Sequence, residues 1–343
     1  MKKLLQVTAL LTFSAFFLPV LTVGFGPQPE EGTLLETENP VFSPVGEASL
    51  PTLSPAESYD QSQTITLWQD GTVRELTLRE YLIGVVAAEM PAGFPEEALK
   101  AQAVAARSYA LYKLALYEKS PQEEHHGAQL CADSGHCEAF VDLAVQASQL
   151  WPSSSEVYAG RIENAVTETD GWVLTWEQEP IAAVFCAASG PKTEASADIW
   201  GRELPYLVSV DSPGGEDCGK YYGEVCISQT EFVSRVQKTL PEAVLSGPAE
   251  EWFQEVQRSS AGSVLSLKLG GAAISGREMR SLAGLNSANF TVRLQDDQLI
   301  FETEGYGHGV GMSQYGARYL ALAGESCEAI LSHYYPGTLL ERR

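Results

Sequence analysis

The segment HHGAQLCADSGHC, residues 125–137, holds the densest set of potential metal ligands in the chain. His125, Cys131, His136 and Cys137 offer two imidazoles and two thiolates, a tetrahedral set that suits structural Zn²⁺ and leaves no open position for water. His126 is a spare imidazole. A Cys131–Cys137 disulfide in an exposed loop is the alternative. No HExxH motif accompanies the cluster, so a zinc hydrolase is the weaker hypothesis.

Glu89 is the candidate for acid–base chemistry. It lies at the end of a predicted helix, among Val85, Val86, Met90 and Phe94. Apolar surroundings disfavour the ionised form of a carboxyl group, so the pKa rises and the group stays protonated near neutrality as a general acid. The alternative is an ordinary solvated glutamate at a helix end.

The segment GYGHGVGMSQYGA, residues 305–317, is rich in glycine and polar side chains. Its glycines allow close approach of the backbone, while His308, Ser313, Gln314 and Tyr315 supply donors, acceptors and a stacking ring, a combination that suits carbohydrate. Ser313 also fits as a helix cap. The segment matches neither a P-loop nor a dinucleotide-binding fingerprint. A glycine-rich turn with a satisfied histidine is the alternative.

The remaining cysteines give weaker signals. Cys186 paired with His308 is a possible nucleophile, but a buried strand cysteine is the favoured interpretation. Cys218 and Cys226 have seven residues between them and could form a disulfide that closes this loop.

Local signals predict the elements that carry these residues. Alternating apolar residues around Asp70-Gly71 indicate a β-hairpin. Thr77 caps a helix that stops at Pro91 and so places Glu89 at its end. A second helix starts at Pro95 and runs through Lys119.

The rest of the chain mixes helices and strands without regular βαβ alternation. The sequence therefore predicts an α+β body in which helices and antiparallel strands surround a substrate groove. The expected elements are helices at 144–150, 228–243 and 313–324, a hairpin in 171–190 that turns at EQEP, and strands at 263–269 and 289–294.

The composition of the chain indicates which binding partners suit its surface, and its N-terminal residues indicate where in the cell it is expected. With 22 basic and 45 acidic residues, the net charge of −23 excludes nucleic acid as a favoured partner and suits a neutral polymer. Lys2 and Lys3 precede an uncharged stretch, residues 4–23, which is long enough to span a membrane. An uncleaved anchor is favoured over a signal peptide cut near Gly24-Phe25-Gly26.

Three segments follow from this pattern. Residues 1–26 are the expected cytoplasmic N-terminus and transmembrane anchor, residues 27–63 a disordered acidic, Pro-rich tether, and residues 64–343 the catalytic domain. No Lys or Arg lies between Lys3 and Arg74, so the body is expected outside the cytoplasm.

Six motifs, in the same order, resemble the SpoIID/LytB family. They are EYLIGVVAAEMP, FPEEALKAQAVAARSYA, SGPKTEASADIWG with PYL at 205–207, ISGREMRSLAGLNSANF, GYGHGVGMSQYGA and EAILSHYYPGT. The chain differs at 187–191, where AASGP replaces a hydroxyl-rich Ser-Thr-Ser-Gly-Gly run, so that only Ser189 carries over.

The resemblance implies a peptidoglycan lytic transglycosylase that cuts glycan strands lacking stem peptides during engulfment at the sporulation septum. It implies Glu89 as the catalytic acid and Arg107, Ser189 and Tyr206 as substrate-binding residues beside those of the glycine-rich segment. Catalysis then needs no cofactor, while Zn²⁺ at 125–137 is structural, as in some clostridial members. Expected partners are an amidase and a membrane protein of the engulfment machinery. The amidase-enhancer branch implies the alternative, a binding protein without catalysis.

Overall fold

The structure is a computed structural model that describes residues 58–150 and 154–343. The predicted membrane anchor and most of the predicted tether lie outside these residues. Among the described helices, none combines the length and the apolar character needed to cross a membrane.

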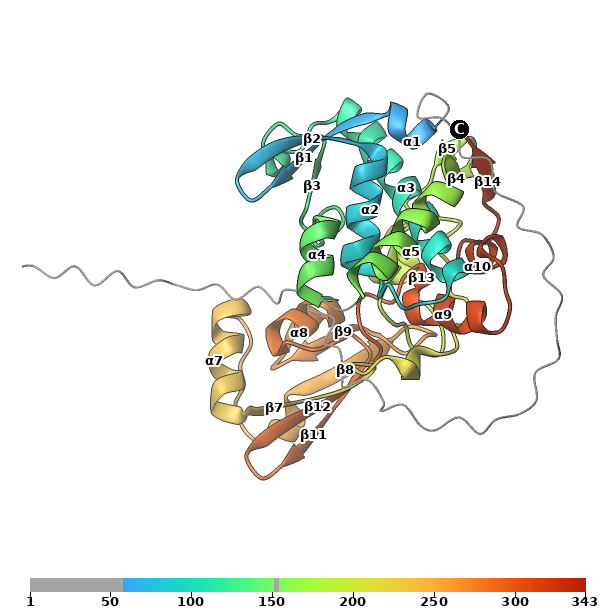
Figure 1. Ribbon diagram of the computed structural model, residues 1–343. Helices are drawn as coiled ribbons and strands as arrows, with labels where there is room; N and C mark the ends of the chain where they lie inside the picture. Colours follow the sequence, from blue (N-terminus) through green and yellow to red (C-terminus); the bar gives the residue numbers. More distant parts are fainter. Residues whose placement is uncertain (1–57, 151–153) are drawn as a thin grey trace, which may run out of the picture. The chain divides into compact units, whose positions relative to one another are not determined.

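The described residues contain helices and strands in mixed order, which confirms the α+β class (Figure 1). The α-helices are α1 (Tyr59–Ser62), α2 (Leu78–Glu89), α3 (Glu96–Lys119), α4 (Leu143–Leu150), α5 (Ser155–Glu168), α6 (Ser196–Trp200), α7 (Gln229–Thr239), α8 (Gly276–Ala283), α9 (Gln314–Leu322) and α10 (Cys327–Tyr334). The 3₁₀ turns are η1 (Glu123–His125), η2 (Gly215–Asp217) and η3 (Ala249–Glu251).

The strands form several small sheets. They are β1 (Thr64–Gln69), β2 (Thr72–Thr77), β3 (Leu130–Cys131), β4 (Trp172–Trp176), β5 (Glu179–Pro180), β6 (Phe185–Cys186), β7 (Tyr222–Ser228), β8 (Phe253–Arg258), β9 (Val264–Leu269), β10 (Ala272–Ser275), β11 (Phe290–Gln295), β12 (Gln298–Glu304), β13 (Met312–Ser313) and β14 (Leu339–Arg342). The sheet orders are β2-β1-β3, β10-β9-β8, β11-β12-β7, β13-β6 and β14-β4-β5. Most pairs are antiparallel, but β1–β3 and β13–β6 are parallel.

The N-terminal hairpin and the two helices after it form as predicted. Asp70 and Gly71 both adopt positive φ, 49° and 82°, as a tight two-residue turn requires. The Thr77 hydroxyl accepts from the Glu80 N–H, and the Glu80 carboxylate accepts from the Thr77 N–H at 2.7 Å. This capping box fixes the start of α2, and Pro95 precedes the first turn of α3.

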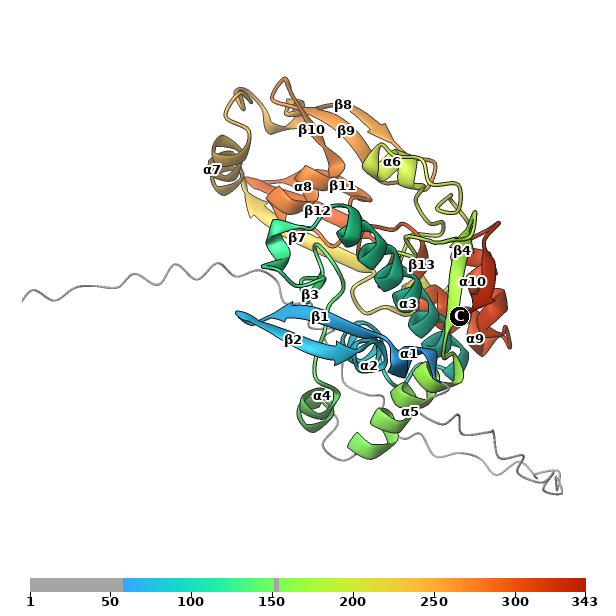
Figure 2. The ribbon, with the colours of Figure 1, turned by 90° about the horizontal axis from the view of Figure 1, so that it is seen from above.

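Helix α3 is the centre of the larger hydrophobic core. Six of its eleven buried residues are alanine, which lets α2, α5, α9 and α10 pack closely around it (Figure 2). The Ser108 hydroxyl of α3 also accepts the Leu174 N–H of β4 at 2.8 Å. The segments that carry Glu89 and the glycine-rich loop are thus held by one helix.

A second hydrophobic core lies in the yellow and orange part of the chain (Figure 1). Helices α7 and α8 pack there against strands β7 to β12, around the buried rings of Phe232, Phe290 and Phe301. The segment 222–304 therefore has its own apolar interior.

Some predicted features differ from the structure. The predicted tether reaches residue 63, but Tyr59–Ser62 forms α1 and Asp60 is 1% exposed. The second hairpin turns at Glu177 and Gln178, both with positive φ, and its second strand is only β5. All six cysteines are free, so neither the Cys131–Cys137 nor the Cys218–Cys226 disulfide is formed.

Candidate functional site

Glu89 is the last residue of α2, and its carboxyl is half-buried. The Ala139 N–H donates to Glu89 Oε1 at 3.0 Å. Burial raises the pKa of Glu89 to about 7, while the Ala139 hydrogen bond acts in the opposite direction. This direction agrees with the sequence-based expectation. The carboxyl is thus poised to give up or take a proton near neutral pH.

The loop that follows Glu89 is held on two sides. Arg161 of α5 donates from Nε to the Ala92 carbonyl oxygen at 2.9 Å. On the other side, the Phe94 ring meets the Tyr315 ring edge-on, with centroids 5.0 Å apart, and the Arg318 guanidinium lies over Phe94. Arg161 was not recognised from the sequence, because its helix carries no motif that marks it.

A second carboxyl, Glu138, lies near Glu89 and was also missed. It is 3% exposed, it accepts from the Tyr81 hydroxyl at 3.1 Å, and its other oxygen has no hydrogen-bond partner among the described residues. Burial, and then the charge of Glu89, raise the pKa of Glu138 well above its ordinary value. Because it is enclosed, Glu138 cannot reach a polymer in solution.

The glycine-rich segment forms one wall of a small pocket. Ser189 and His308 line this pocket together with Glu194, Ser287, Asn289, Glu304 and the backbone of Gly305, Gly307 and Gly309. Gly307 has a φ of 122°, and a Cβ there would lie 2.8 Å from the Cys186 Cβ. Only glycine therefore lets this segment pack against β6.

His308 is neutral near pH 7. The Val310 N–H donates to His308 Nδ1 at 3.1 Å, so the ring proton of the neutral imidazole is on Nε2. Burial and then the charge of Arg280 lower the pKa of His308 to about 4, against a hydrogen bond to the Phe185 backbone. The Trp200 ring lies 5.5 Å from the His308 ring and is 37% exposed. His308 and Trp200 together offer a polar group and an aromatic face.

Most of the other predicted substrate-binding side chains are buried. Ser313 caps α9 through the Gly316 N–H and accepts the Ser189 N–H, while Gln314 donates to Gln102 of α3 at 3.2 Å. The Tyr206 hydroxyl accepts the Ala182 N–H at 3.2 Å. The Ser313 and Gln314 side chains thus hold the glycine-rich segment in place, whereas Tyr206 fastens the segment that precedes β6. Tyr315 remains half-buried.

The structure corrects the role assigned to Arg107. Its guanidinium is completely buried and binds Asp60 at 2.6 Å, and Nη1 also donates to the Trp172 carbonyl oxygen. Arg107 thus fastens α1 and β4 to α3 and lies out of reach of substrate. Asp60 belongs to the segment that the sequence assigned to the tether, which is why this pairing was not anticipated.

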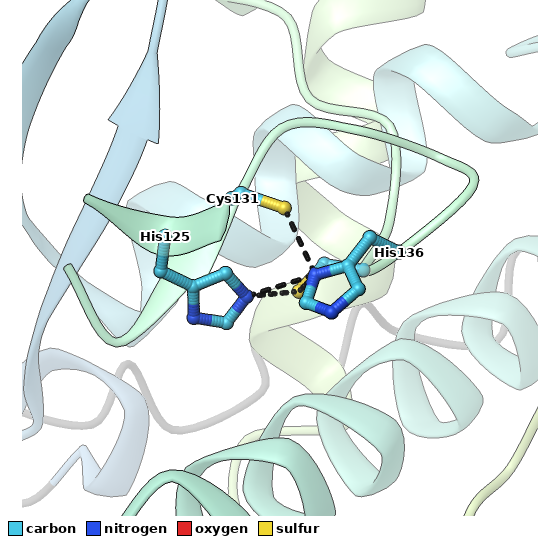
Figure 3. A group of neighbouring side chains, drawn as sticks. His125, Cys131 and His136 are labelled. Carbon is cyan, nitrogen blue, oxygen red and sulfur yellow. Dashed lines mark hydrogen bonds between the residues drawn. The ribbon is translucent and has the colours of Figure 1, made fainter. Parts of the chain in front are cut away.

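The four predicted metal ligands come together at one place, and Figure 3 labels His125, Cys131 and His136 among them. The ligand atoms of His125, Cys131, His136 and Cys137 all lie within 4.8 Å of one another. His125 Nε2 is 3.0 Å from His136 Nδ1 and 3.3 Å from Cys137 Sγ. Cys131 Sγ is 3.5 Å from His136 Nδ1. His126 points elsewhere, because its ring packs on Trp68.

Most of these distances lie near those of a tetrahedral zinc site, while the widest separation reaches up to 4.8 Å. With Zn–N near 2.1 Å and Zn–S near 2.3 Å, ligand atoms are roughly 3.3–3.8 Å apart. The hydrogen bond between the two thiol groups lowers the pKa of Cys131 to about 5 and, together with burial, raises the pKa of Cys137. One thiol of the pair is thus readily ionised, as a metal ligand must be.

The ligand cluster and Glu89 share one short piece of backbone. Cys137 is a ligand, Glu138 is the buried carboxyl, and Ala139 donates to Glu89. Lys113 of α3 also donates to the His136 carbonyl oxygen at 2.9 Å. The position of the Ala139 N–H therefore depends on the loop that the four ligands close.

The chain is similar in sequence to a known protein family and to several characterised proteins. The family model SpoIID, stage II sporulation protein, matches residues 69–176. Stage II sporulation protein D of Bacillus subtilis (strain 168) is 33% identical over 323 residues, which cover 93% of this chain and 90% of that protein. That of Bacillus amyloliquefaciens is 35% identical over 266 residues, 78% and 74% of the two chains. The amidase enhancer of Bacillus subtilis (strain 168) is 27% identical over 310 residues, 76% of this chain and 40% of the enhancer.

Proposed function

Because the chain belongs to the SpoIID family of stage II sporulation proteins, we propose that it is a lytic transglycosylase that cuts peptidoglycan strands without stem peptides during engulfment. The observation that carries this proposal is Glu89, a half-buried carboxyl with a pKa of about 7 at the end of α2. A group with this pKa serves both as acid and as base near neutral pH.

The reaction needs only this one carboxyl. Protonated Glu89 gives its proton to the glycosidic oxygen between N-acetylmuramic acid and N-acetylglucosamine, and the bond from that oxygen to C1 breaks. The Glu89 carboxylate then takes the proton of the muramic C6 hydroxyl as its oxygen bonds to C1. The products are a 1,6-anhydromuramyl end and a free 4-hydroxyl, and no water is consumed.

The surroundings of Glu89 favour this route over hydrolysis. A glycosidase of the usual kind uses two carboxyls that flank the scissile bond. The carboxyl whose charge is coupled to that of Glu89 is Glu138, which is enclosed and bound by Tyr81. Glu138 is therefore unsuited to act on the opposite face of a sugar ring.

The pocket beside the glycine-rich segment supplies groups that suit a sugar polymer. Neutral His308 and the half-buried Asn289 line this pocket, and Trp200 offers an aromatic face for a pyranose ring. Ser189 lines it too, but this residue is 1% exposed and its hydroxyl donates to the Gly190 carbonyl oxygen. The set of His308, Asn289 and Trp200 suits an uncharged acetamido sugar better than a phosphate.

The zinc ion is part of the proposal as a structural element. His125, Cys131, His136 and Cys137 would hold it with no position left for water, so it would stabilise the loop that carries Ala139. Catalysis itself is assigned to Glu89 and needs no cofactor.

We also propose a cellular location and binding partners, which rest on the family resemblance and on the sequence. Residues 4–23 would anchor the protein in the cell membrane, with the N-terminus in the cytoplasm and the body on the outer side at the sporulation septum. An amidase would supply the denuded strands, and a membrane protein would complete the assembly.

Product analysis tests the function. Denuded glycan is digested with the wild-type protein and with Glu89→Gln, and the ends are identified by mass spectrometry. We expect anhydromuramyl ends from the wild type and none above background from the variant, which keeps the Ala139 hydrogen bond but has no proton to donate. Anhydro ends from the variant at the wild-type rate would refute the assignment.

The amidase enhancer among the relatives favours a second candidate, a cell-wall-binding protein that stimulates an amidase without cleaving glycan. The purified protein is assayed alone and with an amidase. Glycan cleavage by the protein alone excludes this candidate. Acceleration of the amidase without any anhydro ends would establish it.

A further inference from the structure

We propose that Arg280 binds the free lactyl carboxylate that a muramic acid carries once its stem peptide has been removed. This inference rests on the proposed function and deepens it, because it names the group by which denuded glycan would be distinguished from peptide-bearing glycan. Arg280 lies outside the residues that the sequence motifs indicated as substrate contacts.

Helix α8 holds Arg280 in a fixed position. The helix starts with a capping box of Ser275 and Glu278 and ends at Gly284, whose φ is 72°. Arg280 is half-buried in its last turn, and its Nε donates to the Leu285 carbonyl oxygen at 3.2 Å. This bond directs the guanidinium along the segment that follows the helix.

That segment leads to the glycine-rich wall of the pocket. The Asn286 carbonyl oxygen, one residue after Leu285, accepts the Gly307 N–H at 3.1 Å. Gly307 is followed by His308, which lines the pocket. The charge of Arg280 helps to lower the pKa of His308, as expected for an unscreened cation close by. The guanidinium thus lies beside the proposed sugar-binding surface.

Arg280 lacks the acidic partner that several other arginines have. Arg107 is paired with Asp60, and Arg318 with Asp217. Arg161 and Arg258 also lack one among the described residues, but the guanidinium of each donates to two carbonyl oxygens. No ion pair joins Arg280 to a carboxylate within residues 58–150 and 154–343, and the only hydrogen bond that its guanidinium makes there is the one from Nε to the Leu285 carbonyl oxygen.

This lack of a partner is notable given the composition of the chain. Acidic residues outnumber basic ones by 45 to 22, so a carboxylate partner is easy to supply. Burial lowers the pKa of Arg280, and its neighbours include Cys186, Tyr306 and the cation of Arg277. Partly burying an unpaired guanidinium costs stability, and a bound anion would offset that cost. We therefore look to the substrate for the missing carboxylate.

Denuded glycan supplies one anion per disaccharide. The lactyl ether of muramic acid ends in a carboxylate when the peptide has been removed, and in a neutral amide when the peptide is attached. The two free Nη groups of a guanidinium can donate one hydrogen bond to each oxygen of a carboxylate. A secondary amide has only one oxygen and no charge, so it cannot accept this bidentate pair. Arg280 would therefore favour the product of an amidase over intact peptidoglycan.

The test compares two matched substrates. Soluble denuded strands with free lactyl carboxylates are one, and the same strands with those carboxylates converted to methylamides are the other. We expect the wild type to cleave the carboxylate form with a kcat/KM about 10- to 100-fold higher, the range for a charge-assisted hydrogen bond. Arg280→Gln should lose this preference by losing rate on the carboxylate form alone.

Two further variants keep the result interpretable. Arg280→Lys keeps the charge without the fork and should show an intermediate preference. Arg277→Gln removes an exposed cation from the same helix and should keep most of the wild-type preference. Thermal unfolding of each variant shows whether it is folded. Equal loss of kcat/KM on both substrates in Arg280→Gln, or no preference in the wild type, would overturn the inference.

A binding measurement separates this inference from the proposed function. Calorimetry with the Glu89→Gln protein measures the affinity for both strands when no bond is cut. A 10- to 100-fold tighter binding of the carboxylate strands, lost when Arg280→Gln is added, would support the inference even if wild-type protein produced no anhydro ends. Equal affinity for the two strands would refute it even if the lyase activity were established.

Discussion

The unusual pKa of Glu89 makes a quantitative prediction about stability. A carboxyl with an ordinary value of 4.5 in the unfolded chain and about 7 in the folded protein binds its proton more tightly when folded. The stabilising contribution of Glu89 is therefore fully present below pH 4.5, and it is lost as the pH rises from 4.5 through 7. The difference corresponds to roughly 3 kcal/mol at pH 8.5.

Glu89→Gln removes this cost while it keeps an acceptor for the Ala139 N–H. We expect its free energy of unfolding to exceed that of the wild type by about 2–3 kcal/mol at pH 8.5, and to equal it within about 0.5 kcal/mol at pH 4. Denaturant titration at both pH values measures the difference. Glu118→Gln, a substitution at an exposed carboxyl on α3, should show no such pH dependence.

Parallel stability profiles for wild type and Glu89→Gln would refute the reasoning. They would mean that the Glu89 carboxyl is as well solvated in the folded protein as in the unfolded chain. The helix end would then have no special chemistry, and another general acid would be needed. A stabilised, inactive variant would instead indicate that the fold tolerates strain at this position for the sake of function.

Three further predictions follow from the site and the core. The kcat/KM for glycan cleavage should be constant below pH 7 and fall about tenfold per pH unit above it, because the reaction starts from protonated Glu89; a pH–rate profile measures this. Cys131→Ala should lose about one zinc per chain in elemental analysis, whereas Cys186→Ala, at a buried thiol outside the cluster, should retain it. Asp60→Asn should cost about 3–5 kcal/mol of unfolding free energy, because it leaves the buried charge of Arg107 unpaired; a loss below about 1 kcal/mol in denaturant titration would contradict this account.

The elements that the sequence predicted best are those whose causes are local. Asp70-Gly71 specifies a tight turn by its backbone conformation, and Thr77 specifies a helix start by its side-chain hydrogen bond. The metal ligands also lie within thirteen residues, so their convergence needs one loop rather than a whole fold. Such features require no knowledge of distant contacts.

The features that the sequence did not reveal depend on distant contacts. Arg107 was assigned to substrate because its true partner, Asp60, lies 47 residues away in the sequence. Only the fold brings the two side chains together. Tyr206 and Gln314 were marked by their motifs, but a motif does not tell whether a side chain is exposed. Glu138 had no signal of its own, since its burial depends on packing around Tyr81.

Helices α5 and α8 were not predicted from the sequence either. For α8 a local signal was present, since Ser275 and Glu278 form a capping box and its buried residues share one face. Yet α5 carries Arg161, which holds the loop after Glu89, and α8 carries Arg280. Their importance comes from where the tertiary structure places them.

The division into two hydrophobic cores has a consequence for how such a protein can diversify. Glu89 belongs to a helix of the α3 core, while Arg280 belongs to a helix of the second core. Substitutions at well-separated sites act nearly independently. With the roles proposed for Glu89 and Arg280, replacements on α8 and its strands would change which polymer is held while the acid is untouched, and loss of the acid would leave a competent binder. A single framework can in this way give rise to either an enzyme or an accessory protein by changes on one side only.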